Sequence, residues 1–257
     1  MSSSKTILFI HGMFMNHTCW NEWVKHFENK GYTCLAPDWP FHSGIPSELR
    51  KNHPDNDLGK LTLTDVLIYF EDIIKTQKEQ PILIGHSMGG LLVQLLINKG
   101  YGACGIAIDP APPKGVFTTK WSFLKSNLPA INPFKGNSPA LMTFKQFQYA
   151  FVNGFSLEEQ KRVYETFVVP ESRNVPRSST SGAGKIDFEK DHAPLLIIAG
   201  GDDHIIPASL NKSNFNKYKT PDSRTDFKEF PGRTHFIIGQ NGWQVVADYV
   251  QHWISSN

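Results

Sequence analysis

Residues 82–96, ILIGHSMGGLLVQLL, decide the fold of this chain. An apolar run with the character of a buried strand passes directly into an apolar run of helical length, and Gly85, Ser87 and Gly89 stand at the junction. Glycines at such a junction let a strand and a helix approach closely, because they carry no Cβ atom. The same turn would lift the Ser87 hydroxyl clear of the backbone. This stretch is therefore either a glycine-rich turn that serves packing or a turn that presents Ser87 as a nucleophile.

Strands and helices alternate outward from the junction in both directions. TILFI at 6–10 and PLLIIAG at 194–200 are continuous apolar runs, which are typical of parallel strands buried on both faces. Short strands are also expected at 33–37, 82–85, 104–109 and 226–230, and helices at 20–30, 62–78, 88–99, 207–218 and 241–254. This order predicts the α/β class, a mostly parallel sheet of about six strands with helices on both faces.

One stretch interrupts the alternation, because residues 116–190 contain no convincing core strand. We therefore expect an α/β core formed by residues 1–115 and 191–257, with residues 116–190 inserted as a helical cap. Four cap phenylalanines recur at the spacing of one helix face: Phe144, Phe147, Phe151 and Phe155. Ser156 and Glu159 then predict a capping box at the start of another helix, and 176–184 is expected to be a loop.

Composition gives little support for a charged partner. The 257 residues carry a net charge of +2, and lysine and arginine are scattered, so neither a nucleic acid nor a membrane surface is an expected partner. Cys19, Cys34 and Cys104 form no CxxC motif and are expected to be small buried side chains in a reducing compartment. The apolar run at 6–10 is too short for a signal peptide. These features together predict a cytoplasmic protein.

If Ser87 is a nucleophile, the chain must also supply a base and an acid beyond this turn. Gly85-His86-Ser87-Met88-Gly89 matches G-x-S-x-G, and a serine becomes a good nucleophile only beside a base that a carboxylate orients. His235 follows the last expected strand and is the candidate base. Three carboxylates follow expected strands and are candidates for the acid: Asp203, Asp202 and Asp109.

With an elbow serine, an acid and then a histidine in this order, residues 5–255 resemble the α/β-hydrolase superfamily. The resemblance implies that Ser87 is the nucleophile, His235 the base and Asp203 the acid, since Asp203 and Pro207 fit D-x-x-x-P. It also implies an oxyanion hole built from the backbone N–H groups of Met88 and Met13, with Phe14 as the alternative to Met13. It further implies that His86 is structural. His42 lies in DWPFHSG, which is similar to a glycine-rich loop of the family but lacks its first glycine.

The resemblance and the phenylalanine-rich cap together imply an apolar substrate. Five residues are expected to bind it: Phe14, Trp121, Phe144, Phe147 and Phe151. The leading hypothesis is a carboxylic-ester hydrolase that acts on an ester or lactone through an acyl-enzyme on Ser87, with no cofactor and no metal. A serine at the elbow does not fit haloalkane dehalogenases or epoxide hydrolases, and Phe236 replaces the lysine of plant-type hydroxynitrile lyases.

Other functions use the same residues and stay open at this point. A C–C bond hydrolase, a thioesterase, an amidase and a cofactor-free haloperoxidase would each use this triad. A ligand-binding, receptor-like homologue would use the fold without turnover. The sequence leaves the physiological substrate and the oligomeric state undetermined.

Overall fold

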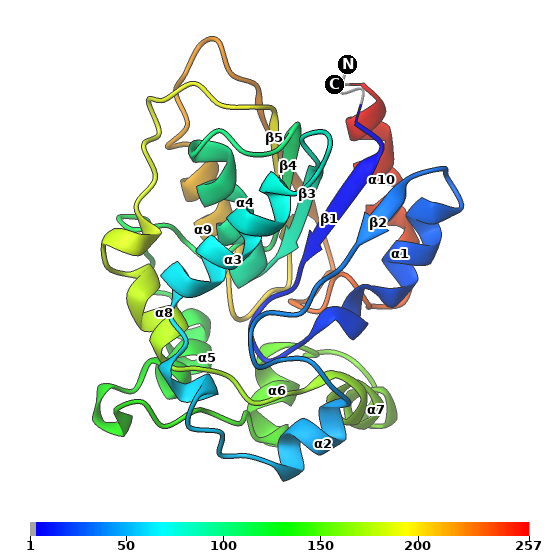
Figure 1. The fold of residues 1–257 in the computed structure, drawn as a ribbon. Coiled ribbons are helices and arrows are strands. Elements are labelled where there is room, and N and C mark those ends of the chain that lie inside the picture. Colours follow the sequence, from blue (N-terminus) through cyan, green and yellow to red (C-terminus); the bar gives the residue numbers. More distant parts are fainter. Residues whose placement is uncertain (1–3, 257) are drawn as a thin grey trace.

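The computed structural model describes residues 4–256, and its centre is a six-stranded sheet in the order β2-β1-β3-β4-β5-β6 (Figure 1). Every neighbouring pair of strands is parallel. The strands are β1 (Thr6–Ile10), β2 (Thr33–Leu35), β3 (Ile82–His86), β4 (Cys104–Ile108), β5 (Leu195–Gly200) and β6 (Thr225–Phe230). The expected α/β class and six-stranded parallel sheet are confirmed.

The register of the central strands sets where their carboxyl ends meet. Ile10 of β1 pairs with Gly85 of β3, and His86 pairs with Ile108 of β4. β3, β4 and β5 are buried along their whole length, as their uninterrupted apolar sequences require. The residues that follow these strands therefore lie at one edge of the sheet.

Helices cover both faces of the sheet (Figure 1). On one face lie α1 (Asn21–Glu28) and α10 (Gln244–Ser255), and on the other α3 (Leu63–Lys75), α4 (Met88–Asn98) and α9 (Ala208–Phe215). These helices lie where the apolar periodicity predicts them, with ends shifted by a few residues. α3 begins with a capping box between Thr62 and Asp65 that the sequence analysis did not single out.

The chain between β4 and β5 forms helices beyond the carboxyl edge of the sheet (Figure 1). They are α5 (Trp121–Ile131), α6 (Phe144–Ala150), α7 (Leu157–Phe167) and α8 (Asn174–Ser179), and α2 (Pro46–Lys51) joins them from an earlier loop. The described part of the chain also contains four short 3-10 helices: His17–Trp20, Leu58–Lys60, Pro133–Lys135 and Gly182–Gly184. The predicted capping box of Ser156 and Glu159 is confirmed at the start of α7.

Two expectations for this segment are wrong. α6 ends at Ala150, so Phe155 lies outside the helix that was expected to carry it. Residues 176–184, expected to be a loop, contain the end of α8 and a 3-10 helix. Pro176 is compatible with α8 because it falls in the first turn, where backbone N–H groups have no partner within the helix.

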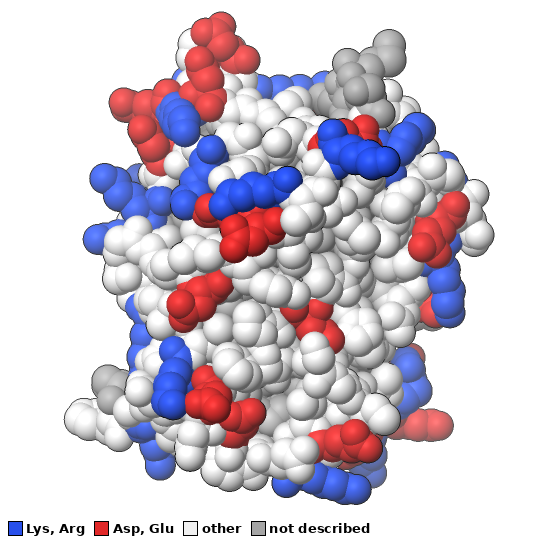
Figure 2. Space-filling view, viewed as in Figure 1, with Lys and Arg blue, Asp and Glu red and all other residues white. Residues whose placement is uncertain are grey.

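Positively and negatively charged side chains are interspersed on the face shown in Figure 2. No helix within residues 4–256 has the length and apolar character to cross a bilayer. Cys19 and Cys104 are buried thiols, whereas Cys34 is only partly buried, because β2 is an edge strand. The expectation of three buried cysteines is therefore wrong for Cys34.

Candidate active site

Ser87 occupies a strained turn between β3 and α4. Its φ of 57° and ψ of −120° lie where a non-glycine residue is costly, and such strain persists only where the surroundings hold it. Ser87 N–H donates to the Ile108 carbonyl, 2.9 Å away. A Cβ on Gly85 would collide with the Gly89 carbonyl, and a Cβ on Gly89 with that of Ile10. Both motif glycines are therefore needed for the strand and helix to pack.

His235 connects Ser87 to a carboxylate through two hydrogen bonds. Its Nε2 lies 3.0 Å from Ser87 Oγ, and its Nδ1 lies 2.6 Å from Asp203 Oδ2. The ring and the carboxylate have no exposed side-chain surface. With a proton on Nδ1, His235 donates to Asp203 and can accept the serine proton on Nε2. This arrangement can remove a proton from Ser87 as it attacks a carbonyl carbon.

The loop after β5 holds the Asp203 carboxylate in place. Asp203 Oδ1 accepts hydrogen bonds from the backbone N–H groups of Ile205 and Ile206, at 2.7 and 2.8 Å. The adjacent His204 ring instead packs against Tyr149 and bonds to its carbonyl. One carboxylate oxygen is thus fixed by the backbone while the other faces His235.

The other two candidate acids lie in different surroundings. Asp202 is exposed, and its carbonyl accepts from Asn153. Asp109 is fully buried, and its Oδ1 accepts from the Gly200 N–H at 2.6 Å. Burial, and then the charge of Asp203, raise the pKa of Asp109 well above its ordinary value. Asp109 is therefore held toward its neutral form, which suits an orienting carboxylate poorly.

His86, Asp109 and His235 come together behind the nucleophile, with one possible metal-ligand atom of each within 4.8 Å of the others. The chain spacing of these residues had not suggested a metal site. One nitrogen of His235 already contacts Asp203 and the other contacts Ser87, so a metal bound there would break one of these two hydrogen bonds. His86 Nε2 lies 2.7 Å from the His235 carbonyl and so supports the loop that carries His235.

The loop after β1 lies directly against the elbow. A Cβ on Gly12 would come within 2.7 Å of Ser87 Cβ and 2.9 Å of the His86 carbonyl. The Phe14 N–H is already used, since it donates to the Glu171 carboxylate at 3.3 Å. Within residues 4–256, neither the Met13 nor the Met88 N–H has an acceptor. These two donors are therefore available for a negatively charged oxygen beside Ser87.

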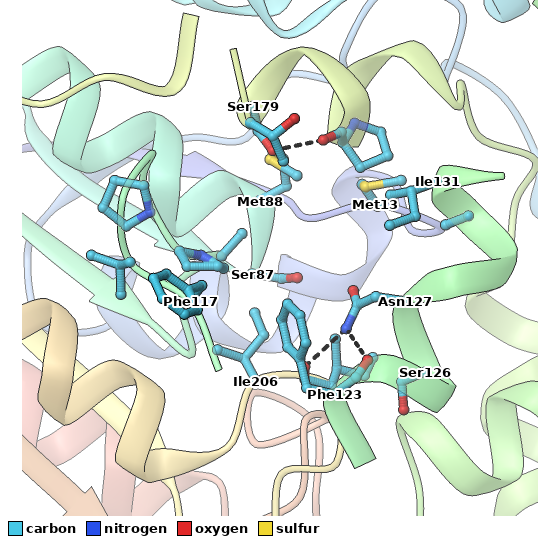
Figure 3. A pocket seen from close by; sticks show the side chains of 18 of the residues that line it. Met13, Ser87, Met88, Phe117, Phe123, Ser126, Asn127, Ile131, Ser179 and Ile206 are labelled. Atoms are coloured by element: carbon cyan, nitrogen blue, oxygen red, sulfur yellow. Dashed lines mark hydrogen bonds between the residues drawn. The ribbon is translucent and has the colours of Figure 1, made fainter. Parts of the chain in front are cut away.

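A cavity of about 340 Å³ opens over Ser87. Met13 and Met88 border it near the serine, while Phe117, Phe123 and Ile206 line other parts of its wall (Figure 3). Asn127 and Ser179 also line the cavity, but the Asn127 NH₂ group and the Ser179 hydroxyl donate to backbone carbonyls of the protein. The cavity therefore favours an apolar molecule with one reactive polar group near Ser87.

Of the five residues expected to bind substrate, two line the cavity and three do not. Phe14 and Phe151 line the cavity. Trp121 does not, because it starts α5 and stands 71% exposed to solvent. Phe144 and Phe147 do not either, because both rings pack against Tyr164. For these three residues the expectation is wrong.

Several lining residues went unnoticed in the sequence. Phe117 lies just before α5 and Phe123 in its first turn, without a periodic pattern, so no sequence signal marked them. Ile205 and Ile206 lie two and three residues after Asp203, and that position was an available signal. His42 and Glu171, 129 residues apart, form a buried pair that no local pattern could reveal.

A model of the alpha/beta hydrolase family matches residues 7–249. A pyrethroid hydrolase of Sphingobium wenxiniae is 31% identical over 93 residues, which span 35% of this chain and 29% of that protein's length.

Solved structures resemble the whole chain. The monoacylglycerol lipase of Paleococcus ferrophilus superposes with a TM-score of 0.71 at 21% identity, covering 98% of this chain and 94% of the lipase. A pyrethroid hydrolase from Sphingobium faniae JZ-2 superposes with a TM-score of 0.70 at 18% identity, covering 98% and 97% of the two chains. At these identities the likeness is one of fold.

Proposed function

Because the chain belongs to the alpha/beta hydrolase family, we propose that it cleaves a carboxylic ester or lactone through an acyl-enzyme on Ser87. The observation that carries this proposal is the pair of hydrogen bonds from Ser87 through His235 to Asp203 beside an apolar cavity. Likeness to a monoacylglycerol lipase and to pyrethroid hydrolases supports an ester as substrate.

In the proposed reaction His235 Nε2 takes the proton from Ser87 Oγ as that oxygen bonds to the carbonyl carbon. The carbonyl oxygen becomes an oxyanion and accepts from the Met13 and Met88 N–H groups. The C–O bond to the alcohol then breaks, and His235 returns its proton to the departing oxygen. Water, deprotonated by His235, attacks the acyl-enzyme in the same way and releases the acid and free Ser87. Asp203 orients and stabilises the imidazolium throughout.

Residues 116–190 act in this proposal as a cap over a core formed by residues 1–115 and 191–257. The cavity wall combines core residues such as Met88 with cap residues such as Phe123 and Phe151. Since the wall is largely apolar, the proposed partner is a small, largely apolar ester or lactone.

The free cysteines support a reducing, cytoplasmic location. Burial raises the pKa of Cys104 to about 12, so this thiol does not compete with Ser87 as a nucleophile.

A substrate panel with a covalent probe tests the proposal. We expect hydrolysis of p-nitrophenyl esters and lactones, and labelling of the wild-type protein by an alkyl fluorophosphonate. Ser87→Ala should abolish both. A ligand-binding homologue without turnover would show neither hydrolysis nor labelling in the wild-type protein, and preference for an amide or thioester would redirect the assignment within the family.

A further inference from the structure

Glu171 and His42 form a buried, hydrogen-bonded pair beneath the loop that follows β1. Glu171 Oε2 lies 3.1 Å from His42 Nε2, and neither side chain has any exposed surface. Glu171 comes from the segment between β4 and β5, whereas His42 comes from the loop after β2. Burying a carboxylate and an imidazole is costly unless hydrogen bonds compensate for the lost water. The proposed reaction assigns neither residue a role.

The Glu171 carboxylate bonds to backbone beside the candidate oxyanion hole. Its Oε2 accepts from the Phe14 N–H at 3.3 Å, and its Oε1 accepts from the Ser172 N–H at 2.6 Å. The Phe14 carbonyl in turn accepts from the Val169 N–H at 3.0 Å. Residues 169–171 therefore hold both polar backbone groups of Phe14.

Phe14 needs such support because of its backbone conformation. Its φ of 61° lies in the left-handed region, which is unfavourable for a bulky residue. Residues persist in this region only where neighbouring groups hold them there. The peptide that joins Met13 to Phe14 includes the Phe14 N–H, so the bond to Glu171 fixes the plane next to the Met13 donor.

His42 is itself held firmly in its orientation toward Glu171. Its Nδ1 lies 3.0 Å from the Pro40 carbonyl, and its ring packs against those of His11 and Trp39. Burial lowers the pKa of His42, but the charge and hydrogen bond of Glu171, together with the Pro40 carbonyl and the charge of Asp38, raise it above its ordinary value. His42 therefore presents a donor to Glu171 Oε2.

We propose that Glu171, held by His42, is a positioning residue for the oxyanion hole. By holding the Phe14 N–H, the carboxylate fixes the turn after Gly12 and leaves the Met13 N–H directed at the space beside Ser87. This inference rests on the proposed function, since it concerns the oxyanion of the same reaction.

The test uses Glu171→Ala and Glu171→Gln in the full-length protein. Glutamine matches glutamate in size, but its NH₂ group must face either the Phe14 or the Ser172 N–H, so one backbone bond is lost in either orientation. Asn214→Ala is the matched control. It removes another fully buried polar side chain, whose amide NH₂ donates to Gln94 at 2.9 Å and which, within residues 4–256, has no hydrogen bond to the loop after β1.

Three quantities are measured for each variant: kcat per serine titrated by fluorophosphonate, KM for p-nitrophenyl butyrate, and the inhibition constant of an alkyl trifluoromethyl ketone. The ketone adds to Ser87 and places an oxyanion in the hole. We expect kcat to fall by about 10- to 100-fold in Glu171→Ala and by about 3- to 10-fold in Glu171→Gln, as small displacements of catalytic groups do. Ketone affinity should weaken in proportion to kcat/KM, while KM changes by less than about threefold.

Asn214→Ala should lower the melting temperature while keeping kcat and ketone affinity at wild-type values. If Glu171→Ala yields no folded protein, Glu171→Gln carries the test by the same three measurements. The inference is overturned if the folded Glu171 variants behave like Asn214→Ala, with wild-type kcat and ketone affinity. Turnover in Ser87→Ala would instead refute the proposed function, so the two failures are distinguishable.

Discussion

The ring of Phe151 stands edge-on against the imidazole of His235, with centroids 4.9 Å apart and planes at 77°. The Phe151 carbonyl also accepts a hydrogen bond from the Phe236 N–H, 3.1 Å away. One residue of the segment between β4 and β5 thus packs on the candidate base, fastens the backbone beside it and lines the cavity. We therefore expect Phe151 to affect both substrate specificity and catalysis.

Replacing Phe151 by alanine should alter the ranking of substrates. The shortened side chain enlarges the cavity beside His235, so activity on a long acyl chain should gain relative to a short one by about 10- to 200-fold in kcat/KM. Phe144→Ala is the control, since that ring packs against Tyr164 away from the cavity. It should lower the melting temperature and leave the ratio unchanged. If both variants keep the same ratio of kcat/KM for long and short acyl chains, Phe151 does not determine substrate preference.

The acid is tested by three substitutions. Asp203→Asn should lower kcat by roughly 10²- to 10⁴-fold, because the amide no longer holds His235 in the required tautomer. Asp202→Asn and Asp109→Asn should be much milder, since neither side chain bonds to the base. Steady-state kinetics at one pH compares kcat of the three variants with that of the wild-type protein. A larger loss in Asp109→Asn than in Asp203→Asn would mean that the acid follows β4.

Asp109 should also make stability depend on pH. Its pKa is raised in the folded protein by burial and by Asp203, so the folded state binds the proton more tightly than the unfolded state does. The free energy of unfolding contributed by this group is therefore lost as pH rises from about 4 toward the raised pKa. Asp109→Asn, which mimics the neutral form, should gain stability over wild type as pH rises. Urea unfolding of both proteins at pH 5 and pH 8 measures this, and an equal difference at both pH values would contradict it.

Gly12 should tolerate no side chain. A Cβ there meets Ser87 Cβ and the His86 carbonyl, so Gly12→Ala must push the loop after β1 away from the elbow. We expect kcat to fall by about 10²- to 10³-fold, the effect of losing one oxyanion donor. Gly182→Ala is the control, because a Cβ at that position meets nothing within 4 Å. Wild-type kcat in Gly12→Ala would show that the loop does not serve the reaction.

The sequence was sufficient for the elements whose pattern is local. The strands expected at 6–10 and 82–85 follow from short apolar runs, and the glycines around Ser87 follow from the close approach of a strand and a helix. Each of these reasons can be read from a few neighbouring residues. Asp203 and His235 could be found because each follows a strand of a parallel sheet, and carboxyl ends of such strands meet at one edge. The candidate triad was therefore accessible without coordinates.

The segment between β4 and β5 was harder to predict because its packing is not periodic. The spacing of Phe144 and Phe147 correctly indicated a helix, but the same spacing could not say whether Tyr164 or a substrate covers that face. Trp121 was expected at the site, yet the direction of α5 turns it to solvent. The bond from Phe14 to Glu171 joins residues 157 apart, and only the folded chain reveals it.

The most direct test of the central claim is peptide mapping by mass spectrometry after reaction with an alkyl fluorophosphonate. The account predicts one adduct, on the peptide that contains Ser87, formed in step with the loss of p-nitrophenyl ester hydrolysis. Ser87→Ala should show neither the adduct nor turnover while keeping the wild-type melting temperature. An adduct on another residue that abolishes activity, or full hydrolysis by Ser87→Ala, would contradict the account.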